Sequence, residues 1–214
     1  MEDLQQFLDI ELSSCSRTLK GEDTWVTQTA VVGEETLHIA AVFDGHGGKR
    51  AAYLCRDRLI GYLLEAANGD PSGASLSAAG ATAFRRAHDE VRALDGGKAT
   101  DGSTATVVLI NPTRREITSL NAGDSSAKIV KEDRRLRRPS LSGAAGAALN
   151  GSSDSHLSTL TTDHRIANSE SERQRLVDMG ALLAHARDRC VPDPTPPHLH
   201  SHPLLCPLCA SPRP

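Results

Sequence analysis

The sequence predicts an α+β fold in which antiparallel strands and helices occupy separate stretches of the chain. Two short runs rich in β-branched residues, at 25–32 and 36–43, are typical of a β-hairpin. Two helix-length stretches with apolar residues at three- and four-residue spacing follow them. Three more β-branched runs come next, and runs of strands separated by runs of helices indicate an α+β domain.

The first strand pair is defined by its turn, Gly33-Glu34-Glu35, which separates the two β-branched runs. A helix with one buried stripe is expected at 48–67, where Asn68-Gly69-Asp70-Pro71 ends it. A second helix is expected at 75–94 because the same spacing repeats there. We expect these two consecutive helices to cover one face of the sheet.

The second half of the chain predicts three short strands and one helix. The strands, at 104–110, 116–121 and 126–130, are expected to form an antiparallel meander. Residues 139–158 are rich in Ser, Gly, Ala and Asn and predict a low-complexity loop. A capping box, in which Ser169 and Glu172 satisfy each other's free amide groups, predicts a helix through Met179 that stops at Gly180.

Composition indicates one globular domain with a tail. The 214 residues are 38% hydrophobic and 24% charged. We divide the chain into an N-terminal segment at 1–12, a domain at 13–189 and a disordered tail at 190–214 that is rich in Pro, His and Cys. Zinc binding by the tail, through His198, His200, His202, Cys206 and Cys209, is an alternative that fits no familiar finger spacing.

Charge and cysteine content limit the partners and the compartment. A formal net charge of −3 gives no reason to expect nucleic acid or a membrane as the main partner. The basic cluster at 134–138 is expected to be a solvated loop, with a contact for phosphorylated or acidic partners as the alternative. Five cysteines without paired spacing, and no apolar run of membrane length, predict an intracellular protein, cytoplasmic or nuclear.

The segment Asp44-Gly45-His46-Gly47-Gly48 is the first candidate for chemistry. It directly follows the apolar run at 37–43, so an acidic side chain and a histidine emerge together at the end of a predicted buried strand. Functional groups tend to gather where strands end and loops begin. The alternative is an ordinary Asp-Gly turn with no chemistry.

Four other segments accompany this one in a fixed order. Together, the five segments resemble the metal-dependent protein serine/threonine phosphatases of the type 2C family, and they are most similar to its plant-like members. The resemblance covers residues 13–185. The four segments are Lys20-Gly21-Glu22-Asp23, Asp101-Gly102-Ser103-Thr104-Ala105, Asn121-Ala122-Gly123-Asp124-Ser125, and Leu160-Thr161-Thr162-Asp163-His164 with the helix start at 168–172. The resemblance implies a four-layer α/β/β/α sandwich of two antiparallel sheets with helices outside.

Glu22, Asp23, Asp44 and the carbonyl of Gly45 offer hard oxygen ligands, which suit Mg²⁺ or Mn²⁺. Resemblance implies that Asp44 bridges two metal ions, that Gly45 supplies a backbone oxygen and that Glu22 supports the site. It also implies that Asp124 helps to hold a further, weaker ion, for which a turn-forming role is the alternative.

The resemblance gives His46 the role of donating a proton to the leaving serine or threonine oxygen, and capping of the following helix is the alternative. Arg17 or Lys20 is the candidate phosphate-binding group. We expect Ser103 and Thr104 to serve packing, Gly102 to relieve crowding near the core, and Asp163-His164 to be mainly structural.

The chain also departs from the family. No Ser-Arg-x-x-Gly-Asp, Asp-Gly-x-x-Asp or Asp-Asn segment follows Gly180, although the family's later metal ligands lie there. We therefore expect a domain truncated at the C-terminus and an incomplete sandwich. The leading function is a monomeric, metal-dependent phosphatase that acts on phosphorylated proteins. The alternative is a catalytically impaired, phosphatase-like binding module or truncated product.

Overall fold

The structure is a computed structural model that describes residues 10–17, 20–130 and 157–183. The basic cluster at 134–138, most of the predicted loop at 139–158 and the whole tail at 190–214 lie outside the described residues. Within them, no helix is long and apolar enough to cross a membrane. Both described cysteines, Cys15 and Cys55, are free thiols.

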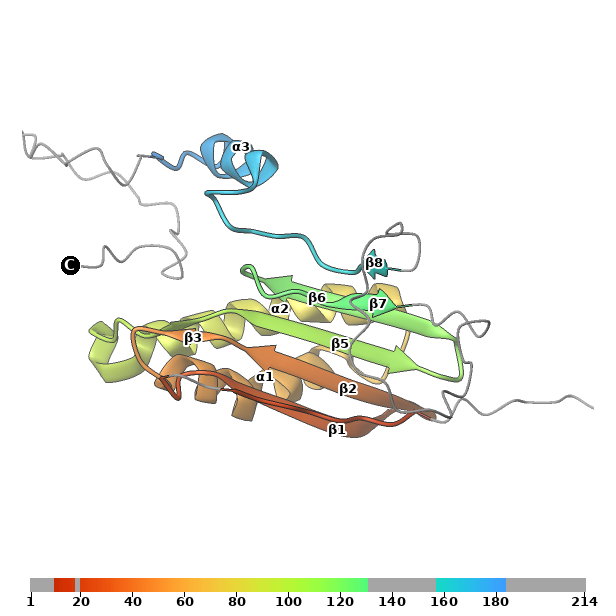
Figure 1. Ribbon diagram of the computed structural model, residues 1–214. Helices are drawn as coiled ribbons and strands as arrows, with labels where there is room; N and C mark the ends of the chain where they lie inside the picture. The colour runs from red at the N-terminus through yellow and green to blue at the C-terminus, as the bar shows by residue number, and fades with distance from the viewer. Residues whose placement is uncertain (1–9, 18–19, 131–156, 184–214) are drawn as a thin grey trace, which may run out of the picture.

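One four-stranded antiparallel sheet and two helices form the body of the molecule (Figure 1). The sheet has the order β1-β2-β5-β6, and both helices lie on the same face of it. Its strands are β1 (Thr24–Val32), β2 (Glu35–Phe43), β5 (Ala105–Asn111) and β6 (Glu116–Ala122), and the helices are α1 (Arg50–Ala67) and α2 (Gly73–Ala93). This arrangement confirms the α+β class, the hairpin and the helical layer, which together form one half of the expected sandwich.

Shorter elements connect or extend this body. They are β3 (Gly45–His46), a 3-10 turn (Leu94–Gly97), β4 (Gly102–Ser103), β7 (Lys128–Val130), β8 (Leu157–Thr159) and α3 (Glu170–Asp178). Ser169 caps α3 by accepting the Glu172 N–H, as the capping box predicts. The Glu172 carboxylate, however, is bound by Arg175.

The hydrophobic core lies between the sheet and the two helices. Alternate residues of β2 point into it, and Phe43, Leu37 and Ile39 are fully buried. Leu59 and Leu63 of α1 meet them from the helical side. The intervening residues of β2 point to the opposite face, because successive strand side chains alternate.

The predicted meander is wrong at its third strand. β7 pairs with β8 in a separate two-stranded sheet, and Lys128 lies opposite Thr159. The chain does not reverse tightly after β6: the Ala127 N–H donates to the Thr161 hydroxyl, and the Leu160 N–H donates to the Ala127 carbonyl. The stretch after β6 therefore does not turn back to pair with β6. It pairs with a segment more than 30 residues further along the chain. β8 also corrects the predicted loop boundary, because the strand begins at Leu157.

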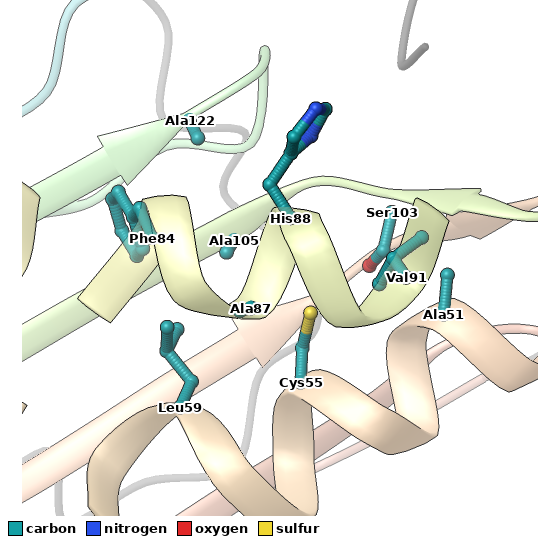
Figure 2. Close-up of a pocket in the computed structure, with 10 residues that line it drawn as sticks. All are labelled: Ala51, Cys55, Leu59, Phe84, Ala87, His88, Val91, Ser103, Ala105 and Ala122. Atoms are coloured by element: carbon teal, nitrogen blue, oxygen red, sulfur yellow. The ribbon is translucent and has the colours of Figure 1, made fainter. Parts of the chain in front are cut away.

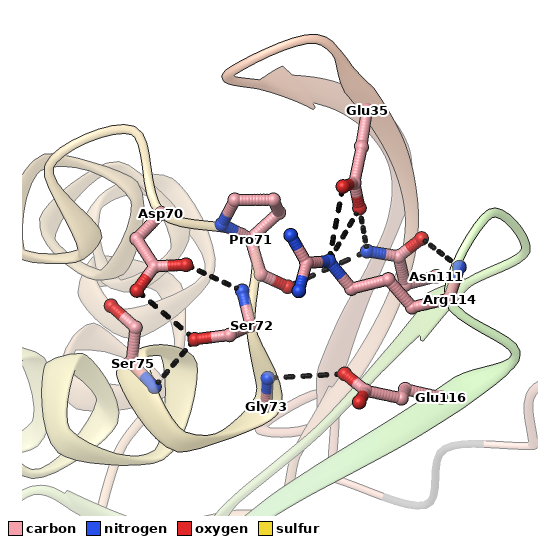
Figure 3. A network of polar contacts seen from close by, with 9 residues as sticks. All are labelled: Glu35, Asp70, Pro71, Ser72, Gly73, Ser75, Asn111, Arg114 and Glu116. Atoms are coloured by element: carbon pink, nitrogen blue, oxygen red, sulfur yellow. Dashed lines mark hydrogen bonds and ion pairs between the residues drawn. The ribbon is translucent and has the colours of Figure 1, made fainter.

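A polar network joins three connections at the end of the sheet where β2 begins (Figure 3). Arg114 donates to the Glu35 carboxylate, with 2.8 Å from Nε to Oε2. Asn111 donates to the same carboxylate at 2.6 Å and accepts the Arg114 N–H at 3.1 Å. Glu116 accepts the Gly73 N–H at the start of α2. The network fixes the β1–β2, α1–α2 and β5–β6 connections to one another.

The network predicts a pH dependence of folding stability. Hydrogen bonds from Arg114 and then Asn111 hold the pKa of the Glu35 carboxyl below its ordinary value. Because the folded-state pKa is depressed, the stabilisation is complete above the unfolded-state pKa, about 4.3 for glutamate, and is lost as the pH falls through the folded pKa. Urea unfolding between pH 6 and pH 3 should therefore show a steeper loss for wild type than for Glu35→Gln. Glu34→Gln, one residue away in the exposed turn, should keep the wild-type slope, and parallel curves for wild type and Glu35→Gln would refute the linkage.

Candidate active site

The Asp44–Gly48 turn is positioned by two short strands next to the sheet. β3 pairs with β4, so that Gly45 lies opposite Ser103 and His46 lies opposite Gly102. Gly45 has no room for a side chain, since a Cβ there would lie 2.3 Å from the backbone oxygen of Glu22. The segments that carry Glu22, His46 and Gly102 are thus brought together by close backbone contact.

Thr104 holds the backbone of Asp44 from both sides. Its hydroxyl accepts the Asp44 N–H at 3.1 Å, and its own N–H donates to the Asp44 carbonyl at 2.9 Å. The same hydroxyl is 2.7 Å from the Ser125 hydroxyl. Thr104 therefore links the turn after β2 to the turn after β6, a role that its predicted packing function did not include.

Asp101 fixes the start of α1. Its buried carboxylate accepts the Arg50 N–H at 3.0 Å and the Arg50 guanidinium at 2.7 Å. The guanidinium holds the pKa of Asp101 below its ordinary value. The N-cap of α1 is Lys49, which makes no side-chain cap bond, and the N–H of Arg50, the first helical residue, is bound by Asp101. Asp101 thus takes the capping position that the alternative assigned to His46.

A cleft of about 460 Å³ opens beside this turn. Its walls come from four segments that are far apart in the sequence: the ends of β2 and β4, the turn after β6, and the stretch before α3. The lining residues are Asp44, His46, Ser103, Thr104, Gly123, Asp124, His164, Arg165, Ile166 and Ala167.

Negative charge accumulates at the Asp44 side of the cleft. Partial burial raises the pKa of the Asp44 carboxyl, and the charges of Asp23 and Asp124 raise it further, as does a hydrogen bond with Asp23. His46 opposes these effects. Three carboxyl groups that repel one another are a donor set that a hard divalent cation would stabilise. Among the described residues, no group of three His, Cys, Asp or Glu side chains is close enough to hold a metal ion.

The other predicted site residues lie less centrally. Glu22 is half-buried and reaches the site through its backbone contact with Gly45. Arg17 and Lys20 are exposed and do not line the cleft. The structure therefore brings together Asp23, Asp44, His46 and Asp124, and it does not bring either candidate phosphate-binding residue to them.

Two cleft residues, His164 and Arg165, are absent from the predicted site. The His164 N–H donates to the Gly123 carbonyl at 3.2 Å, and the Asn121 side chain donates to the Thr162 carbonyl at 2.8 Å. These bonds agree with the predicted structural role of the Leu160–His164 segment, and they also carry the next residue to Asp124. The Asp-His motif gave a signal for this segment, but nothing in it pointed to Arg165.

A second, smaller cavity of about 60 Å³ lies between α1, α2 and the sheet (Figure 2). Its walls are mainly apolar, and Ser103 lines both this cavity and the cleft. Burial raises the pKa of the Cys55 thiol to about 11. Burial, and then Arg92, lower the pKa of His88. The thiol therefore stays protonated at neutral pH and is not activated as a nucleophile, so the cavity lacks the charged groups of the cleft.

Known proteins are similar to this chain in sequence and in fold. A probable protein phosphatase 2C 8 of Oryza sativa subsp. japonica is 31% identical over 164 residues, which cover 63% of this chain and 40% of that protein. A probable protein phosphatase 1N of Homo sapiens is 35% identical over 108 residues, covering 46% of this chain and 25% of the human protein. The chain thus spans well under half the length of these relatives.

The fold is also similar to that of a C. elegans sex determining protein, with a TM-score of 0.56 and 22% identity over 78% of this chain and 37% of the other. The match to a family model covers more of this chain than any of these three pairwise matches. The family model described as Protein phosphatase 2C matches residues 17–191, which include all five motifs and every residue that lines the cleft. The chain belongs to the protein phosphatase 2C family.

Proposed function

We propose that this chain carries the catalytic half-site of a metal-dependent protein phosphatase that hydrolyses phosphoserine and phosphothreonine in proteins. The observation that carries the proposal is the cleft lined by Asp44, His46 and Asp124, with Asp23 close to Asp44, within a protein phosphatase 2C chain. Mg²⁺ or Mn²⁺ is the proposed cofactor, two ions in a complete site. The proposed substrates are phosphorylated proteins inside the cell, in the cytoplasm or the nucleus. The proposed active form is a monomer.

The ions would be held by Asp44, Asp23 and the Gly45 carbonyl, with support from Glu22. Asp124 would hold a further ion. Bound divalent ions neutralise phosphate charge and lower the pKa of water. The protein's own contribution is orientation and proton transfer. Thr104 fixes the Asp44 backbone through two hydrogen bonds, so the point from which the carboxyl group extends is set before any ligand arrives. His46, at the rim of the cleft, can donate a proton to the departing serine or threonine oxygen near neutral pH.

The test is metal-dependent release of phosphate from a phosphothreonine peptide. We expect the 214-residue chain to release phosphate with Mn²⁺ and to lose the release on chelation. Asp44→Ala should fall to background because the proposed metal ligand is gone. Asp89→Ala, which removes an exposed aspartate from α2, is the matched control and should keep the wild-type rate.

The second candidate function is a phosphatase-like module that binds a partner without catalysis. Two observations favour it: the described residues hold no three-ligand metal group, and an arginine is paired with Asp124. Background release by wild type whose circular dichroism shows a folded protein would contradict the phosphatase proposal and support this module.

A further inference from the structure

The Asp124 carboxylate is paired with a positively charged side chain of the protein itself. Arg165 Nη2 forms an ion pair with Asp124 Oδ2, and both residues line the cleft with Asp44 and His46. The Asp124 side chain is 25% exposed and the Arg165 side chain 58% exposed. The contact therefore lies at the rim of the cleft, where the carboxylate is partly shielded and the guanidinium is open to water.

The backbone holds Arg165 in this position. The Arg165 N–H donates to the Asp163 carboxylate at 2.7 Å, and its carbonyl accepts the N–H groups of Asn168 and Ser169 at the approach to α3. One residue earlier, the His164 N–H is bonded to the Gly123 carbonyl, next to Asp124 itself. Because the segments on both sides of the ion pair are bonded, the guanidinium is presented to Asp124 at little cost in chain entropy.

The charges of the cleft are unequally balanced. Asp44 has the two carboxylates Asp23 and Asp124 near it, and His46 is its neighbouring basic group. Asp124, in contrast, is paired directly with a permanent cation. Arg165 contacts one of the two oxygens of the Asp124 carboxylate and offsets its negative charge. A divalent ion ligated by Asp124 would have to share this carboxylate with the guanidinium, and the two positive charges would repel each other, so the ion pair disfavours binding of the ion.

We infer that Arg165 is a tethered counter-ion that competes with a divalent cation for Asp124, so that the ion pair weakens metal binding on this side of the cleft. The inference rests on the proposed function in so far as that function needs a metal in the cleft. The inference goes beyond that function by assigning to Arg165 the role of lowering the metal affinity of the site through its ion pair with Asp124.

Metal binding without substrate tests the inference, and the probe is Mn²⁺ alone. The loss of the free-ion electron paramagnetic resonance signal on titration gives Kd for the 214-residue chain and its variants. Arg165→Gln should bind Mn²⁺ about 2- to 5-fold more tightly than wild type, the factor that corresponds to a partly exposed ion pair. In an Asp124→Asn background, Arg165→Gln should leave Kd unchanged because the contact no longer exists.

Arg85→Gln is the matched control. It removes the same charge from the exposed face of α2, where Arg85 donates to the Ala81 carbonyl of its own helix, and it should keep the wild-type Kd. Thermal melts by circular dichroism check that each variant is folded.

The outcomes separate the inference from the proposed function. Mn²⁺ binding with equal Kd in wild type and Arg165→Gln would overturn the inference alone. Tighter binding by Arg165→Gln in the Asp124→Asn background as well would overturn it too, since the effect would then be one of net charge. No binding by any of the proteins would overturn both.

Discussion

Phe43→Ala is expected to lower the free energy of unfolding by about 3–5 kcal/mol, because removing a buried aromatic ring loses its transfer energy and leaves a cavity. Phe43 is fully buried at the end of β2, in the core between the sheet and the helices. A domain of this kind has a total stability of about 5–15 kcal/mol. The substitution therefore removes a large part of it, and urea unfolding followed by far-UV circular dichroism should show the loss as a lower midpoint.

The neighbouring residue provides the control. Val42 precedes Phe43 in the same strand, but its side chain points to the opposite face of the sheet and is 51% exposed. Val42→Ala should change the unfolding free energy by about 0.5 kcal/mol or less. Equal losses for the two variants would mean that the core is not confined to the helix-covered face, and would contradict the layer arrangement in Figure 1.

Sequence patterns predicted the elements of the sheet and its helical layer well where the pattern was local. The alternation in β2 and the three- and four-residue spacing in α1 and α2 reflect burial on one face, so element type and position followed directly. The turn signal at Gly33 also sufficed, since the glycine has φ of +61° between two paired strands. The predicted start of α2 was two residues late because Ser72, its cap, lies just after Asp70-Pro71.

Pairing between distant segments was the part that local patterns did not contain. The partner of β7 is β8, and the 26 residues between them that the structure does not describe give no periodic signal. β3 and β4 have two residues each and no pattern of their own. Their pairing nevertheless decides what His46 faces. Arg165 was missed for the same reason, since the bonds of Thr162 and His164 to the turn after β6 bring it to Asp124.

Gly102 shows how such a pairing changes the interpretation of one residue. The sequence predicted that Gly102 relieves crowding near the core, whereas the structure places it directly across from His46. A Cβ at Gly102 would lie 2.3 Å from Cε1 and 2.4 Å from Nε2 of the His46 imidazole. The crowding that glycine avoids is thus with the proposed proton donor. Contacts this short cannot be tolerated, so the imidazole must move if a methyl group is added.

Gly102→Ala is therefore expected to displace the His46 ring while the fold remains. The ring is the end of a side chain at the cleft and can shift without unpacking the core. Phosphate release should fall about 10²- to 10⁴-fold, the range for loss of a general acid, and the imidazole resonances of His46 should shift in NMR spectra. The resonance shift is expected whether or not the chain is an active phosphatase, so it tests the geometry independently of the function.

The control for Gly102→Ala is a glycine with open space around it. Gly61 lies in α1, and a Cβ there would meet nothing within 4 Å. Gly61→Ala should leave the His46 resonances and phosphate release unchanged and should stabilise the protein by about 0.5–1 kcal/mol, because alanine loses less conformational freedom than glycine in a helix. If Gly102→Ala also left the His46 resonances in place, the pairing of β3 with β4 would be wrong. His46 would then lack the wall that orients it toward the cleft, and its role as proton donor would lose its structural basis.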